Sequence, residues 1–70
     1  MYGIVKWFDN GKGYGFIFGQ NTEDFFVHYS AIAESGFKFL EQGDVVQFDT
    51  RYCRFGHQAI NVRRIHAVNR

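Results

Sequence analysis

The fold is decided by residues 12–32, KGYGFIFGQNTEDFFVHYSAI. Two stretches rich in Phe, Tyr, Val and Ile, residues 13–19 and 24–29, flank a polar run that begins with glycine. Aromatic and β-branched residues favour strands, and a polar run between two such stretches is typical of a turn. The segment therefore predicts two neighbouring antiparallel strands.

The rest of the chain continues this pattern. Strand-like stretches also occur at 2–9, 44–51 and 57–66, and the turn at 9–12 contains Asn-Gly, the strongest short hairpin signal. Residues 30–36 predict one helical turn at most, because the run is short and ends at a glycine. The longest connection is 33–43. Five short strands are too few for two packed sheets, whereas closure into a small barrel removes exposed sheet edges.

Size and composition predict a small cytoplasmic protein. The chain of 70 residues is long enough for one domain, and its one cysteine excludes an internal disulfide. We assign the domain to residues 1–66 and a short basic tail to 67–70. The apolar runs are too short for a membrane span or a signal peptide. Residues 1–50 carry three lysines and seven acidic residues, whereas 51–70 carry five arginines and no acidic residue. This asymmetry fits either a surface for a polyanion or an ordinary solvated face.

Side chains in a strand alternate between its two faces, which sorts the apolar residues into two groups. The first group is the predicted core: Val5, Ile17, Phe25, Val27, Ile32, Val46, Phe48, Ile60 and Val62. The opposite face keeps Tyr14, Phe16, Phe26 and His28. Alternation from Val5 would place Trp7 inside, so an exposed Trp7 requires either a bend in the strand or a core assignment shifted by one residue.

An exposed face of this kind suits single-stranded nucleic acid. Stacking of a base on an aromatic ring contributes roughly 1–3 kcal/mol, and every base offers a flat face. Lys6 and Lys12 lie next to the rings in sequence and would neutralise phosphates.

At these residues the chain resembles bacterial cold-shock proteins. Residues 12–17, KGYGFI, are similar to the first RNA-binding motif of that family, and residues 26–29, FVHY, to the second. The resemblance implies an all-β, five-stranded antiparallel OB-type barrel that binds single-stranded RNA and DNA with a pyrimidine preference. It further implies action as an RNA chaperone or regulator of gene expression in a cold-shock-type stress response. The implied stacking residues are Trp7, Tyr14, Phe16, Phe26, His28, Tyr29 and Phe37, and the implied phosphate or sugar contacts are Lys6, Lys12 and Arg54.

Other interpretations remain open at this point. Phe18, Phe39 and Phe55 depart from the family pattern and would either extend the stacking surface or join this chain to a second copy or another protein. Strand alternation puts Tyr29 on the same face as the core residues Phe25 and Val27. Catalysis by Cys53 and His57 is not expected, because no acidic residue is near enough in sequence to orient the histidine. A metal site of Cys53, His57 and His66 is not expected either, because the spacing of paired ligands is missing. We therefore expect a monomer without enzymatic activity, cofactor, metal or small-molecule substrate.

Overall fold

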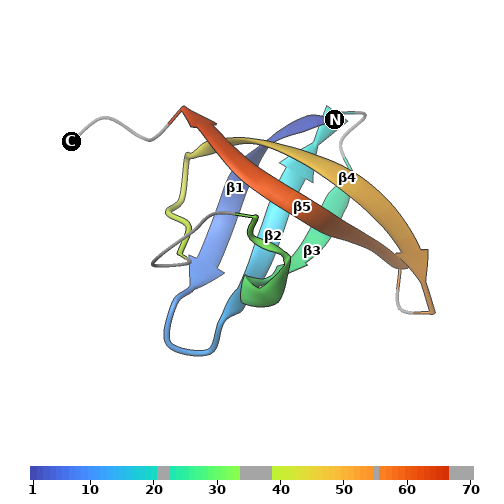
Figure 1. Ribbon diagram of the computed structural model, residues 1–70, viewed down its shortest axis with the longest axis horizontal. Coiled ribbons are helices and arrows are strands. Elements are labelled where there is room, and N and C mark those ends of the chain that lie inside the picture. Colours follow the sequence, from blue (N-terminus) through green and yellow to red (C-terminus); the bar gives the residue numbers. More distant parts are fainter. Residues whose placement is uncertain (21–22, 34–38, 55, 67–70) are drawn as a thin grey trace.

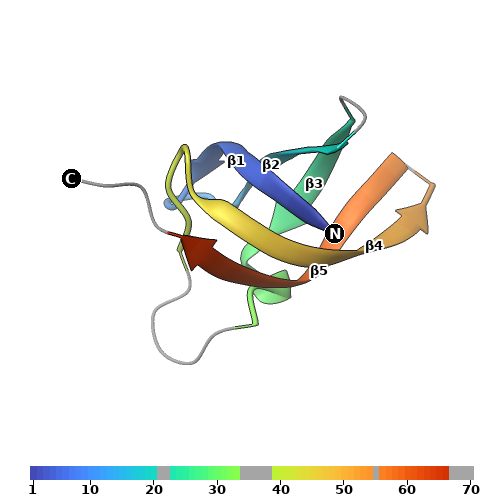
Figure 2. The ribbon, with the colours of Figure 1, turned by 90° about the horizontal axis from the view of Figure 1, so that it is seen from above.

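A computed structural model describes residues 1–20, 23–33, 39–54 and 56–66 of the chain, with only the backbone of residue 66. The elements are close to the predicted ranges: β1 (Tyr2–Asp9), β2 (Tyr14–Gly19), β3 (Asp24–His28), the 3₁₀ turn η2 (Tyr29–Ala31), β4 (Val45–Cys53) and β5 (Gly56–His66). Strands β4 and β5 run together obliquely across β1, β2 and β3, and their hairpin reaches past β3 (Figures 1 and 2). Within the described ranges, no helix is long and apolar enough to cross a membrane.

The strands close into a barrel in the order β1-β2-β3-β5-β4. A ring with an odd number of strands cannot alternate in direction all the way round, so one pairing must be parallel. That pairing joins β3 to β5, and the other four are antiparallel. The five-stranded OB-type barrel predicted from the sequence is confirmed, with this one parallel contact as the difference.

The barrel interior holds one hydrophobic core. Its members are Val5, Ile17, Phe25, Val27, Ile32, Leu40, Val46, Phe48, Ala59 and Val62. The assignment of Ile60 to the core was wrong, since Ala59 takes the inward position and Ile60 is only half-buried. In the β4–β5 ladder Gln47 pairs with Arg63 and Asp49 with Ile60, which leaves two β5 residues opposite Phe48. This β-bulge breaks the alternation of β5.

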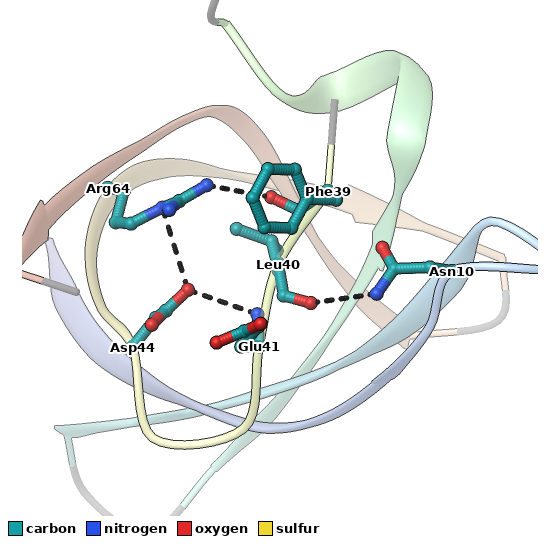
Figure 3. A network of polar contacts seen from close by, with 6 residues as sticks. All are labelled: Asn10, Phe39, Leu40, Glu41, Asp44 and Arg64. Atoms are coloured by element: carbon teal, nitrogen blue, oxygen red, sulfur yellow. Dashed lines mark hydrogen bonds and ion pairs between the residues drawn. The ribbon is translucent and has the colours of Figure 1, made fainter. Parts of the chain in front are cut away.

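Leu40 was missing from the predicted core because it lies in the long connection, outside any strand. The segment that carries it is held by polar contacts on both sides (Figure 3). The Asn10 amide donates to the Leu40 carbonyl at 3.1 Å, and the buried Asp44 carboxylate accepts from the Glu41 backbone N–H at 3.0 Å. These contacts fix the connection where it enters β4.

Arg64 ties the same connection to β5, the strand that pairs with β4. Its Nε lies 3.5 Å from the Asp44 carboxylate, and its Nη2 donates to the Phe39 carbonyl at 3.1 Å (Figure 3). The guanidinium carbon is 4.6 Å from the centroid of the Phe39 ring, within the range of a cation–π contact. Phe39 is therefore half-buried against Arg64, in a structural role.

Candidate nucleic-acid interface

Four aromatic rings meet on the outer face of β1, β2 and β3. The ring centroids of Trp7 and Phe16 are 5.6 Å apart, those of Trp7 and Tyr14 5.8 Å, those of Tyr14 and Phe26 5.9 Å, and those of Phe16 and Phe26 5.7 Å. These separations are typical of edge-to-face or tilted aromatic pairs. Each ring thus touches two others, and the four form one continuous apolar surface.

Trp7 reaches this surface because β1 is bulged. Val5 pairs with Ile17 and Trp7 pairs with Phe16, so Lys6 is the extra residue in the ladder. The bulge shifts the alternation by one residue and turns the Trp7 side chain outward, where 41% of it is exposed. Of the two alternatives open for Trp7, the bend in the strand is the one that the structure shows.

Gly13 lets the Tyr29 ring pack closely against the β1–β2 turn. Its φ of +81° is strained for any residue with a side chain, and a Cβ there would lie 2.5 Å from Cδ2 of Tyr29. The Gly13 carbonyl also accepts from the backbone N–H of Tyr29 at 2.9 Å. The β1–β2 turn and the start of η2 therefore pack together through this glycine.

His28 and Tyr29 extend the ring surface at the end of β3. Their ring centroids are 4.5 Å apart, and Tyr29 is 49% exposed despite its core parity. Nδ1 of His28 accepts from the backbone N–H of Ser30 at 3.3 Å and lies 2.9 Å from the Ser30 hydroxyl, which holds the ring at the start of η2. We call the whole surface the aromatic platform: Trp7, Tyr14, Phe16, Phe26, His28 and Tyr29.

The three expected phosphate contacts have different surroundings. Lys6 forms an ion pair with Asp24, with 2.8 Å between Nζ and Oδ2. Because β2 lies between β1 and β3, this pair crosses the outer face of β2. Lys12 is exposed in the β1–β2 turn, where its backbone N–H donates to the Asp9 carboxylate at 2.9 Å. Arg54 is exposed in the β4–β5 turn.

A groove lies beside the aromatic platform, between β3 and the β4–β5 hairpin. It has a volume of about 530 Å³ and is lined by Phe16, Asp24, Phe26, Cys53, Gly56, His57 and Gln58. The parallel pairing of Phe26 with Gln58 brings its two sides together. Sequence reasoning did not name Asp24, although it lies two residues from Phe26 on the same strand, and it did not find Gln58, which only the β3–β5 closure places beside the rings.

A model of the 'Cold-shock' DNA-binding domain matches residues 1–65. The chain belongs to the cold-shock domain family. It is 51% identical over 65 residues to the "Cold shock-like protein CspB" of Bacillus cereus, a match that covers 93% of this chain and 100% of that protein. It is also 55% identical over 60 residues to "Cold shock protein 1" of Lactiplantibacillus plantarum, covering 86% and 91% of the two chains. The "Cold shock protein CspC" of Bacillus subtilis is 50% identical over 62 residues, covering 89% and 94%. Nucleic-acid binding and a role in the cold-shock response follow for this chain at the level of the family.

Three aromatic residues singled out from the sequence of this cold-shock domain do not belong to the platform as the structure describes it. Phe37 and Phe55 lie outside the described residues. Phe18 is 43% exposed on β2, and pairs with Ile4, which is 49% exposed. Together with Tyr2, these residues form a second apolar surface on the far side of the Lys6–Asp24 pair.

Cys53 and His57 have structural contacts. The Cys53 thiol donates to the Gly56 carbonyl at 3.2 Å, and the His57 ring packs against Phe25 and Tyr52. Glu23 approaches Nδ1 of His57 at 3.9 Å. Among the described residues, no three His, Cys, Asp or Glu side chains gather in a way that would hold a metal ion.

Proposed function

We propose that this cold-shock domain binds single-stranded RNA and DNA by stacking bases on the aromatic platform. The observation that carries the proposal is the patch of four rings, each touching two others, on the outer face of three adjacent strands. Rings fixed against one another on a rigid sheet lose little side-chain freedom when a base stacks on them. Bases of any sequence can use such a surface, since every base has a flat face.

The energetics favour action as an RNA chaperone. With roughly 1–3 kcal/mol per stacked base, a few bases stabilise the open strand by as much as a short hairpin gains from pairing. Binding of the open form then shifts the equilibrium away from the hairpin by mass action, and no hydrolysis is needed. A modest preference for pyrimidine runs agrees with surfaces that select through stacking and backbone flexibility. The same shift in RNA structure would regulate gene expression in the cold.

A titration of Trp7 fluorescence tests the proposal directly. The chain has one tryptophan, it lies in the platform, and a stacked base should quench it. We expect oligothymidine and an unstructured RNA to quench the signal at far lower concentration than a duplex of the same length, because paired bases hide their faces. Equal affinity for a hairpin stem and for its unpaired strand would refute stacking as the mechanism.

The second apolar surface favours self-association as a further candidate. Tyr2, Ile4 and Phe18 are each exposed by between 43% and 51%, and among the described residues no charged side chain lines the hollow between them. Sedimentation velocity over a range of protein concentrations tests this candidate. A dimer that dissociates in Phe18→Ser but not in Phe26→Ser would support it, and a monomer at all concentrations would exclude it.

A further inference from the structure

The strand register places five residues side by side across the whole ring of strands. Trp7 pairs with Phe16, Phe16 with Phe26, Phe26 with Gln58, and Gln58 with Arg51. Side chains directly opposite one another on neighbouring strands are close enough to contact a common ligand. The row therefore continues the aromatic platform, through Gln58 of β5, to Arg51 of β4.

The residues added to the platform in this way also face outward. Ala59 follows Gln58 and is fully buried, so alternation turns Gln58 to the outside, where it lines the groove beside Phe26. On β4 the buried Val46 and Phe48 set the inward parity, which places Arg51 on the outer face. The row is thus one surface.

Arg51 is a cation left unpaired within the part of the chain that the structure describes. Its side chain is exposed, and it makes no ion pair or hydrogen bond with any of the described residues. Lys6, at the other end of the row, is paired with Asp24 at 2.8 Å and must give up that partner to reach a phosphate. Asp49 is the acidic residue closest to Arg51 in sequence, and its carboxylate accepts a hydrogen bond from the Asn61 amide at 3.1 Å.

We propose that Arg51 binds a phosphate of the single strand, which continues from the aromatic platform past Gln58 onto β4. The proposal rests on the proposed function, because the strand must first occupy the platform. Four strand spacings of about 4.8 Å separate Trp7 from Arg51, so the row is about 19 Å long on the barrel surface. The 4–16 nucleotides usually bound by one OB fold are enough to cover it.

The test compares Arg51→Gln with Arg63→Gln, which removes the same charge elsewhere. Arg63 is exposed on β5 opposite Gln47, about 16 Å along the strand from Gln58. Affinity for an oligothymidine of about ten nucleotides is measured between about 50 and 200 mM salt. One lost phosphate contact reduces the magnitude of the slope of log affinity against log salt by about 0.7. The loss of affinity in Arg51→Gln, relative to the unmodified protein, should therefore be about 2.6-fold larger at the lower salt than at the higher. Arg51→Lys should restore the slope, since it keeps the charge.

The outcomes separate this inference from the proposed function. An unchanged slope in Arg51→Gln, or the same change in Arg63→Gln, would overturn the role of Arg51. If Phe16→Ala still weakened binding in that case, stacking on the platform would stand. If the unmodified protein failed to bind the oligothymidine, both proposals would fall together.

Discussion

Adjacent residues of β2 offer the sharpest test of the two faces of the sheet. Phe16 points outward and touches Trp7 and Phe26, whereas Ile17 points inward and is 0% exposed. Phe16→Ala removes one stacking ring and should weaken oligonucleotide binding by roughly 1–3 kcal/mol, or about 5- to 150-fold in Kd. The same substitution also removes two ring contacts within the protein and, at about 0.5–1.5 kcal/mol for each, should cost about 1–3 kcal/mol of stability.

The matched control is Ile17→Val. Removing one buried methyl group costs about 0.5–1.5 kcal/mol, which overlaps the lower part of the range for Phe16→Ala, but leaves the outer face intact. Ile17→Ala is less suitable, because a loss of about 2–5 kcal/mol is a large part of the total of about 4–10 kcal/mol expected for 70 residues. Ile17→Val should lower the melting temperature by about 2–12 °C and change the affinity less than twofold.

Both variants are measured in two assays. Urea unfolding gives the stability, and the anisotropy of a labelled oligothymidine gives the affinity without depending on Trp7, whose emission the Phe16 substitution would itself alter. Equal losses of affinity in Phe16→Ala and Ile17→Val would mean that stability controls binding. Unchanged affinity in Phe16→Ala would remove Phe16 from the binding surface.

Three further predictions concern the charges and the packing around the platform. The slope of log affinity against log salt should be near −1.5 to −3, as expected for roughly two to four phosphate contacts with a single strand, and a value steeper than about −5 would show that charge rather than stacking dominates. Gly13→Ala should cost at least about 1–2 kcal/mol of stability, because it strains a positive φ and displaces the Tyr29 ring, and it should weaken binding as well. Asp44→Asn should lower the free energy of unfolding in urea by about 1–3 kcal/mol, because a neutral amide interacts less favourably with Arg64 than the buried carboxylate does. Its oligonucleotide affinity, measured without urea, should stay within about twofold.

Local alternation was sufficient to predict the central part of the site. In β2 and β3 the ladder is regular, so every second residue faces the same way from one end of the pairing to the other. Tyr14, Phe16 and Phe26 could therefore be assigned to the outer face from the sequence, with Ile17 and Phe25 behind them in the core. No information about distant residues was needed.

Bulges limited what alternation could predict in β1 and β5. Trp7 faces outward because of the extra residue in β1, and Ala59 replaces Ile60 in the core because of the extra residue in β5. The position of a bulge depends on how two strands fit together, including the positive φ of 52° at Asn61. A single strand, considered alone, does not contain that information.

The remaining features were decided by how the strands assemble. The side-by-side pairing of β1, β2 and β3 brings Asp24 to Lys6, the β4–β5 hairpin brings Arg64 to the connection before β4, and closure of the barrel between β3 and β5 brings Gln58 to Phe26. Each of these contacts joins segments far apart in the chain. The amino-acid sequence by itself determined the strands, the parity of the regular ones and the presence of an aromatic outer face, because these follow from local side-chain chemistry. Which cations remain available to a phosphate beside that face was decided only by the tertiary structure, because a charge is neutralised by its neighbours in space.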